Sequence, residues 1–512
     1  MSSLIQQQLP FQMEDTFPIL LSLILLTMFL ILNVTKRFKP KSSSDNITSN
    51  LPPGPWKLPI FGSIHHLIGS LPHHKMRELS QKYGPLMHLQ LGETSAIVVS
   101  SKELAKEVLK TNEVKFAQRH CSLGIEIISY GCTDIAFSPY GDYWRQLRKI
   151  CTLELLTAKR VRSFRSIREE EVSKLIRHIS INTGTTINLT NEILSMTYNI
   201  ISRASFGDKC KDQESYILFM KECMRLAENF SVSNLFPSQH WLHVISGMVH
   251  KLKRLHRSGD MVLEKIINKA TTKTCEDGSL LSYLLKLKDD GSSNPTGFHL
   301  TINNIKAIIQ DMLIGGSDSS SLTMEWAFSE LLKNPKALKR AQEEVRQAFG
   351  SRGYVDEMDL QELKFLKAVI KETLRLHPIN PIYSRECIET CEINGYTIPA
   401  GTQVFVNAWA IGRDQKYWNE GEKFYPERFL DCPIDYKGSD FEFLPFGAGR
   451  RMCPGISFAM PNIELALAQL LYYFDWEFPF GTSHESFDMS EAFGAVVKRK
   501  SELTVIPTPY NP

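Results

Sequence analysis

The sequence predicts a mainly helical protein with a minor β lobe, and three observations support this fold class. Nine segments between residues 102 and 376 repeat apolar residues about every 3.6 positions, as helices with one buried face do. Residues 86–100 predict a hairpin, because apolar and turn-prone residues alternate there around the β-branched run at residues 97–99. Apolar residues make up 43% of the 512-residue chain, which is enough for a large core.

The N-terminal segment predicts a membrane anchor followed by a stiff connection. Residues 17–34 form an apolar run just long enough to span a bilayer. Acidic residues precede the run and basic residues follow it, so residues 1–16 are expected in the lumen and residues 57–512 in the cytoplasm. Residues 35–56 form a basic and polar linker that ends in a proline hinge. A cleaved signal peptide is the alternative, but the basic region and cleavage site typical of one are missing.

Ten cysteines are scattered along the chain, and none of them forms a CxxC pair. The closest two, Cys387 and Cys391, have no second pair that could complete a zinc site. Because disulfides are rare in proteins that face the cytoplasm, we expect nine cysteines to be reduced and mostly buried. The tenth, Cys453, differs because it lies in a loop with several glycines.

The loop Phe443–Gly455 is where we expect the chemistry. Cys453 precedes an apolar, helix-like run, and a helix N-terminus favours an ionised thiolate. Arg451 places a fixed cation two residues before the sulfur, and the glycines allow close approach to a flat group. A lone cysteine in such a turn is usually a small buried hydrophobic residue. Taken alone, the loop therefore leaves open a structural thiol and a ligand for a cofactor with anionic groups.

The spacing Phe446-x-x-Gly449-x-Arg451-x-Cys453-x-Gly455 resembles the cysteine loop of the cytochrome P-450 family, the haem-thiolate monooxygenases. The resemblance implies the cytochrome P-450 fold, with a haem between a long central helix and the cysteine loop with its following helix. It also implies that Cys453 is the axial ligand of the haem iron. By the same resemblance Arg451 contacts a haem propionate, Phe446 packs under the ring, and Gly455 belongs to the cofactor-binding loop.

Further haem contacts follow from the same resemblance. Trp144-x-x-x-Arg148 places an indole and a guanidinium on one helix face, a pattern that by itself is typical of an amphipathic helix with a solvated arginine. In the family the pattern Trp-x-x-x-Arg implies that both residues hold a haem propionate. Arg385 lies where the family places another propionate contact.

A second resemblance concerns structure behind the haem. Glu372 and Arg375 form an i, i+3 pair, which on a solvated helix face contributes little stability. The family uses Glu-x-x-Arg in a buried network with a later arginine, and Pro426-Glu427-Arg428-Phe429 supplies that arginine in the expected order. We therefore expect Glu372, Arg375 and Arg428 to be structural and not catalytic.

Residues 301–332 form the longest proline-free helical segment, and its centre contains Gly315, Gly316 and four serines. Each glycine costs about 1 kcal/mol relative to alanine in a helix, so we expect the helix to be locally opened. The alternatives are a flexible segment and a tight helix crossing. The resemblance implies an oxygen groove in which both glycines make room for dioxygen, with Asp318 and Ser319 as the catalytic proton-delivery pair. Ser319 departs from the usual threonine and lacks the methyl group that fixes the rotamer.

Three further expectations concern the rest of the chain. Phe493 and Val496 lie in an apolar, turn-bearing stretch, which by resemblance is the last loop to enter the substrate pocket. Pro461 lies within the helix expected over residues 454–474 and predicts a kink or early break there. The polar residues 272–295 predict a loop.

Together these features predict a single-pass protein of the endoplasmic reticulum membrane that oxidises a lipophilic small molecule with O2. The chain shows no Gly-x-Gly-x-x-Gly fingerprint after a strand, so electrons from NADPH are expected through a separate NADPH–cytochrome P-450 reductase. The net charge of +3 offers no broad basic field for nucleic acid. Within the family, the chain resembles plant microsomal terpenoid oxidases, in particular those acting on casbene-type macrocyclic diterpenes. This last resemblance rests on general likeness and predicts hydroxylation, successive oxidation or epoxidation.

Other functions stay open at this point. A haem-thiolate isomerase or dehydratase acting on peroxides would need no reductase. The missing threonine favours it, whereas Asp318 and the retained hydroxyl favour a monooxygenase. A fatty-acid epoxygenase is a second alternative. A non-catalytic haem sensor is a third, and the glycine and serine pattern of the oxygen groove argues against it.

Overall fold

The computed structural model describes residues 50–226, 235–239, 247–272, 278–290 and 298–510. The predicted anchor at residues 17–34 and most of the linker lie outside these described residues. Within them, no helix combines the length and the apolar character needed to cross a bilayer. The proline hinge is described, and its backbone forms no helix.

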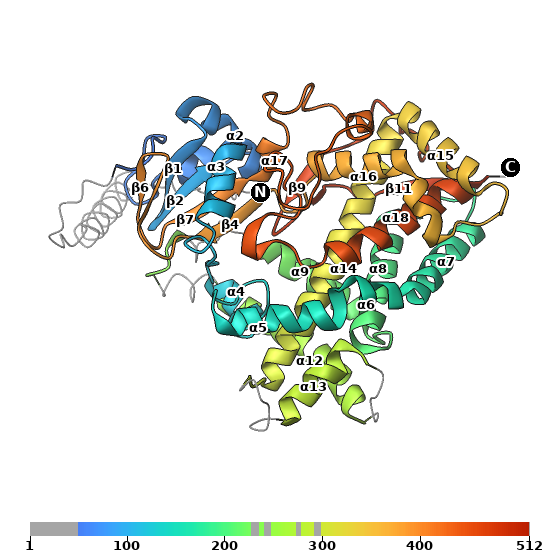
Figure 1. Cartoon of the computed structure of the whole chain (residues 1–512), viewed down its shortest axis with the longest axis horizontal. Helices are drawn as coiled ribbons and strands as arrows, with labels where there is room; N and C mark the ends of the chain where they lie inside the picture. Colours follow the sequence, from blue (N-terminus) through green and yellow to red (C-terminus); the bar gives the residue numbers. More distant parts are fainter. Residues whose placement is uncertain (1–49, 227–234, 240–246, 273–277, 291–297, 511–512) are drawn as a thin grey trace, which may run out of the picture.

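A four-stranded sheet forms one end of the molecule, as Figure 1 shows. Its strand order is β1 (Leu86–Leu91), β2 (Thr94–Val99), β7 (Gln403–Asn407) and β4 (Ile382–Glu386). The first two strands pair antiparallel, with Leu86 opposite Val99, which confirms the predicted hairpin. Smaller sheets consist of β5 (Cys391–Ile393) with β6 (Tyr396–Ile398), β9 (Glu491–Phe493) with β10 (Val497–Arg499), and β3 (Ile187–Asn188) with β11 (Thr504–Pro509) and β8 (Phe474–Glu477).

Helices form the rest of the molecule, which confirms the predicted fold class. The central helix α14 (Ile302–Lys333) starts with a capping box between Thr301 and Asn304 and packs against α8 (Leu189–Phe206) and α18 (Ile456–Tyr473) (Figure 1). The other α-helices are α2 (Pro72–Tyr83), α3 (Lys102–Lys106), α4 (Leu123–Ile128), α5 (Asp142–Cys151), α6 (Ala158–Ser163), α7 (Arg165–Ile181), α9 (Gln213–Leu226), α12 (Met248–Thr272), α13 (Leu280–Asp290), α15 (Pro335–Phe349), α16 (Lys364–Leu376) and α17 (Ala408–Ile411).

Short helical turns supplement these elements. The π-helical turns η2 (Glu107–Thr111) and η3 (Thr152–Leu156) continue α3 and α5, where regular helices were expected. The 3-10 turns are η1 (Ile64–Leu67), η5 (Glu357–Glu362), η6 (Pro426–Phe429) and η7 (Gly449–Arg451). The turn η2 contacts η7, so the extra π turn lies directly against the cysteine loop.

Three local expectations were wrong. The loop expected over residues 272–295 contains α13, whose buried leucines pack into the main core. Of the kink or early break expected at Pro461, the early break does not occur, because α18 continues to Tyr473 and its many buried side chains outweigh the cost of one proline, about 3 kcal/mol. The kink stays a prediction. The α14 helix is not opened at its glycines and serines, and continues as a regular α-helix across them.

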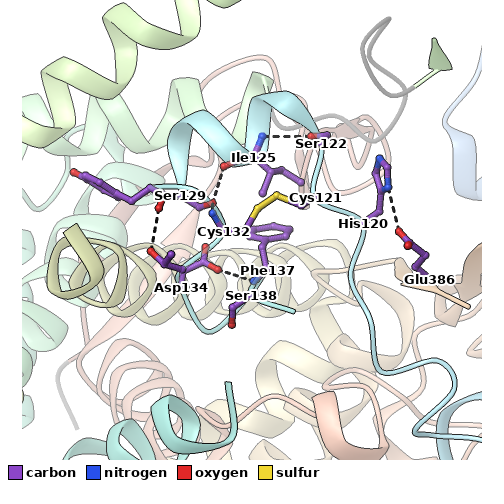
Figure 2. Close-up of a disulfide and its surroundings, with 12 residues drawn as sticks. His120, Cys121, Ser122, Ile125, Ser129, Cys132, Asp134, Phe137, Ser138 and Glu386 are labelled. Atoms are coloured by element: carbon purple, nitrogen blue, oxygen red, sulfur yellow. Dashed lines mark hydrogen bonds and ion pairs between the residues drawn. A yellow bond between two sulfur atoms is a disulfide. The ribbon is translucent and has the colours of Figure 1, made fainter. Parts of the chain in front are cut away.

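The prediction of nine reduced cysteines was also wrong, because Cys121 and Cys132 form a disulfide. Figure 2 shows this bond beside α4, which joins the two cysteines and brings their Cα atoms to 6.6 Å. The capping bond from Ile125 N–H to the Ser122 hydroxyl orients the start of α4. The redox state of a compartment acts on the whole chain and does not predict this local return of the backbone.

Candidate functional site

The cysteine loop is shaped by backbone contacts that require its glycines. Gly449 has a φ of +68°, and a Cβ atom there would lie 2.0 Å from the carbonyl oxygen of Leu109 in η2. The N–H of Cys453 donates to the carbonyl of Phe446 at 3.0 Å. The N–H of Gly455 in turn points to the Cys453 Sγ at 3.4 Å, one residue before α18 begins at Ile456. The loop therefore presents the sulfur at a fixed position beside a helix N-terminus.

The Cys453 side chain lies deep in the protein and still keeps exposed surface, so protein side chains do not cover the sulfur completely. Burial raises the pKa of its thiol, and the Gly455 N–H and Arg148 only partly oppose that shift. The protein alone therefore favours the neutral thiol. A metal ion bound to the sulfur would supply the charge that stabilises the thiolate.

Four arginines gather around this region, and we call Arg119, Arg148, Arg385 and Arg451 the arginine cluster. Among the described residues, Arg148, Arg385 and Arg451 donate to backbone carbonyls, including Arg451 to Ala117 at 2.8 Å and Arg148 to Met452 at 2.5 Å. No carboxylate among the described residues forms an ion pair with any of the four. The cluster thus concentrates positive charge that the more distant carboxylates of Asp134 and Asp311 offset only in part.

The pKa values of the arginine cluster reflect the same excess of positive charge. Burial, followed by repulsion from Arg119 and Arg148, lowers the pKa of Arg451 to about 9. Burial and the cations of Arg119 and Arg451 hold the pKa of Arg385 well below its ordinary value. Because these shifts disfavour the charged forms, an anionic ligand at this place would be stabilised strongly.

Arg119 is a site residue that the sequence analysis missed. It sits after β2 and η2 in a stretch without a recognisable spacing, and its Nε atom is buried with no hydrogen-bond partner among the described residues. Burial lowers its pKa, partly opposed by Asp134. Only the tertiary structure shows that this arginine joins the other three.

Trp144 supports the cluster and does not present a free donor. Its indole N–H donates to the carbonyl of Ile135 at 3.0 Å, and the side chain is buried. The guanidinium carbons of Arg451 and Arg148 lie 4.3 and 5.4 Å from its ring centroid. Trp144 is therefore a platform that positions both arginines through cation–π contacts.

The two predicted groove glycines of α14 face different surroundings. A Cβ atom at Gly316 would lie 2.7 Å from the Ile201 side chain, so this glycine permits the close crossing of α14 and α8. A Cβ atom at Gly315 would meet nothing within 4 Å. The alternative of a tight helix crossing thus accounts for Gly316, and only Gly315 borders open space.

The predicted proton-delivery residues follow Gly315 on the same helix. Asp318 is deep in the protein, and burial raises the pKa of its carboxyl to about 6 against the partial opposition of Lys498 and Lys221. The Ser319 hydroxyl donates to the Gly315 carbonyl at 2.6 Å. Its hydrogen is used in this bond, so the hydroxyl can accept a further hydrogen bond through its lone pairs but cannot donate one. The neighbouring Ser320 hydroxyl is buried without a partner among the described residues, which keeps it as an alternative.

The structural network expected behind the haem is present. Arg375 forms two hydrogen bonds with Glu372, at 2.7 and 2.8 Å, and both side chains are fully buried. Arg428 adds a third bond to Glu372 at 2.9 Å. Remaining donors of Arg375 reach the carbonyls of Gly412 and Gly421. This network is satisfied by protein groups alone.

The two predicted pocket residues lie at the C-terminal hairpin. Phe493 ends β9 and Val496 precedes β10, and both pack against an apolar cluster with Leu322, Trp326 and Ile379. Leu322 follows Asp318 by one turn of α14. The hairpin thus lies beside the same helix that carries Gly315 and Asp318.

These observations fit a haem. The exposed but deep Cys453 sulfur suits an iron ligand, and the arginine cluster with the unpaired Arg119 nitrogen suits two propionates. Phe446, half-buried and packed edge-on against Tyr436 at 5.5 Å, lies in the loop that would support the ring. The open space at Gly315 is where a helix could border a flat group.

Comparisons with known proteins agree with this geometry. The cytochrome P450 family profile matches residues 52–506. The chain is 53% identical to cytochrome P450 71D11 of Lotus japonicus over 90% of this chain and 96% of that protein. It is 48% identical to premnaspirodiene oxygenase of Hyoscyamus muticus over 95% and 98% of the two chains.

A solved zebrafish cytochrome P450 with progesterone has a TM-score of 0.75 and 26% identity to this chain. The match covers 86% of this chain and all of that one, so it includes both the β lobe and the helical part. Haem with a cysteine thiolate ligand is the cofactor of this family, and the residues around Cys453 fit it. The chain therefore belongs to the cytochrome P450 family and is a monooxygenase.

Proposed function

We propose that this cytochrome P450 is anchored in the endoplasmic reticulum membrane and hydroxylates a lipophilic plant terpenoid, with a macrocyclic diterpene as the leading candidate. The observation that carries the proposal is the apolar cluster of the C-terminal hairpin, which packs against α14 one turn from Asp318. An apolar lining with few polar groups favours a hydrocarbon-like substrate. The name of the relative premnaspirodiene oxygenase supports a terpene in particular.

The residues of the chain have separate tasks in this reaction. When bound, the haem supplies dioxygen activation and insertion of one oxygen atom into the substrate. Cys453 would hold the iron, the arginine cluster would hold the propionates, and Gly315 leaves room beside the central helix. Asp318, with a pKa of about 6, can take and release protons near neutral pH. The lone pairs of Ser319 can accept a hydrogen bond from a water molecule and orient it.

We also infer an acidic flavoprotein partner, NADPH–cytochrome P450 reductase, on the side of the cysteine loop. A surface hollow of about 370 Å³ is lined there by basic and aromatic residues, among them Arg145, Arg148, Lys149 and Arg450. Arg148 also bonds the carbonyl of Met452, next to Cys453. A basic surface so close to the cysteine loop favours docking of an acidic electron donor.

The substrate proposal is tested with membranes that contain the full-length protein and a plant reductase. Candidate substrates are a casbene-type diterpene, a sesquiterpene hydrocarbon, a free fatty acid and a fatty-acid hydroperoxide. We expect an oxygenated terpene whose formation requires both NADPH and the reductase. Products from the fatty acid alone would instead indicate an epoxygenase. Turnover of the hydroperoxide without reductase would indicate an isomerase or dehydratase.

The anchor has its own test. Deletion of residues 1–36 should release the protein from membranes while haem content stays at the level of the full-length chain. Loss of haem on deletion would show that this segment belongs to the folded core and would contradict the anchor.

A further inference from the structure

Three polar side chains meet between the N-terminal lobe and the C-terminal hairpin. We call His73, His74 and Glu491 the His–Glu cluster. His73 and His74 lie in the first turn of α2, and Glu491 begins β9. The Nε2 atoms of both histidines lie 2.9 Å from the same oxygen, Glu491 Oε2. The three possible metal-ligand atoms lie within 4.8 Å of one another. Among the described residues, this is the only group of three or more His, Cys, Asp or Glu side chains with such spacing.

A third histidine approaches the same carboxylate from the helical part. His377 follows α16, and its Nδ1 lies 3.7 Å from Glu491 Oε1, too far for a hydrogen bond. Its Nε2 lies 2.7 Å from Glu330 of α14, and its ring stacks on Trp326 at 4.0 Å. The bond to Glu330 favours a hydrogen on Nε2, which leaves the Nδ1 lone pair directed at the cluster. A carboxylate that orients a histidine in this way is typical of metal sites.

We propose that the His–Glu cluster binds a divalent transition-metal cation of the zinc type through two imidazole nitrogens and one carboxylate. Zn²⁺ binds nitrogen and oxygen ligands at about 2.0–2.2 Å, so tetrahedral ligand atoms stand about 3.3 Å apart. The two nitrogen–oxygen separations of 2.9 Å need only a small opening to reach that spacing, and the two nitrogens, which lie within 4.8 Å of each other, must come to the same spacing. His377 or a water molecule completes four ligands.

Solvent reaches the His–Glu cluster on one side, and a cation bound there would connect two elements of the fold. The His73 side chain is fully buried and that of Glu491 is 8% exposed, whereas His74 is 35% exposed and opens the site to solvent. A bound cation would tie β9 to α2. Because β9 ends at Phe493, the cation would also stiffen the hairpin that the proposed function places at the substrate pocket, a consequence that rests on that function. The metal site itself does not depend on the substrate.

A cluster without a cation is the alternative. Both histidines can donate an Nε2–H to Glu491, and the carboxylate is then satisfied by hydrogen bonds alone. The two arrangements differ in which ring nitrogen carries the hydrogen. They also differ in whether zinc binds, which a direct measurement decides.

The experiment uses the full-length holoprotein, treated with a chelator and then dialysed against a limiting concentration of ZnCl2. Zinc per protein is measured by mass spectrometry of the metal, and affinity by calorimetry. The variants are His74→Ala and Glu491→Gln, because His74 is partly exposed and its loss should spare the fold. His66→Ala is the matched control, since His66 belongs to a second adjacent histidine pair and its Nε2 lies 3.2 Å from the Trp56 carbonyl. Haem content reports folding in each variant.

We expect one zinc per protein in the native chain and in His66→Ala, with affinity weaker by on the order of tenfold or more in both cluster variants. Zinc should raise the midpoint of thermal unfolding of the native protein and of His66→Ala only. Absence of zinc in the native protein, or equal zinc in His74→Ala and Glu491→Gln with normal haem content, would overturn the site. These readouts do not involve turnover, so they stand or fall separately from the proposed substrate.

Discussion

Two groups of buried arginines in this molecule meet very different surroundings. Arg375 is fully buried, but it shares two hydrogen bonds with Glu372 and gives its other donors to backbone carbonyls. Arg385 is equally buried, yet its side chain donates to the carbonyl of Ser384 and the cations beside it are Arg119 and Arg451. A buried charge is costly unless it is paired. The first group is therefore complete in the protein, whereas the arginine cluster is complete only with an anionic cofactor.

The largest effect is expected from a substitution that breaks the complete group, which is the network of Glu372, Arg375 and Arg428. Glu372→Ala removes the carboxylate that two arginines share and leaves both cations buried. We expect the free energy of unfolding to fall by about 3–5 kcal/mol, measured by denaturant titration. Glu343→Ala is the control, because Glu343 forms an exposed i, i+4 pair with Lys339, and it should change stability by less than about 1 kcal/mol. Equal effects in the two variants would contradict a structural role for Glu372.

The second prediction concerns the arginine cluster, which has no carboxylate partner among the described residues. Arg385→Leu removes a buried cation that lacks a protein carboxylate, so the haem-free protein should unfold at the same or a higher denaturant concentration. Haem should dissociate faster by on the order of tenfold, measured by transfer of haem to an excess of a second haem protein.

A buried but paired arginine serves as the control for this prediction. Arg168 bonds Glu357 at 3.0 Å and the Val161 carbonyl at 2.8 Å. Arg168→Leu should therefore lower the stability of the haem-free protein without a specific effect on haem release. The distinction between the two groups would be lost if Arg385→Leu destabilised the haem-free protein as strongly as Arg168→Leu.

The same contrast between filled and open surroundings applies to the paired glycines of α14. Gly316→Ala pushes a methyl group into Ile201 and should cost about 1–3 kcal/mol of stability. Gly315→Ala meets open space and should stabilise the helix by up to about 1 kcal/mol. Thermal unfolding of both variants measures the difference. In the haem-free protein, a destabilising Gly315→Ala would show that the space beside Gly315 is filled by protein.

The sequence was informative where function depends on local spacing. The cysteine loop, the pair Glu372–Arg375 and the later Arg428 follow from residues a few positions apart or in a recognisable order, and the structure brings the three network residues together. The hairpin at β1 and β2 followed from its alternation. In each case a short motif contains most of the physical information.

The sequence was uninformative where distant segments converge. Arg119 and the His–Glu cluster have no motif, because their partners come from elements hundreds of residues away. The pair Cys121–Cys132 depends on the return of the chain around α4, and the fate of Pro461 depends on how much of α18 is buried. Local patterns do not contain the packing that decides these features.

The most direct test of the haem site concerns the sulfur of Cys453, which lies next to Arg148 of the arginine cluster. The absorption spectrum of the reduced carbon monoxide complex reports whether a thiolate is the axial ligand, because a thiolate shifts the main haem band to longer wavelength. We predict this shift in the native protein and its loss in Cys453→Ser, with the shift retained in Cys151→Ser, which replaces a buried cysteine elsewhere. A Cys453→Ser protein that binds haem and keeps the shifted band would contradict the assignment of the site.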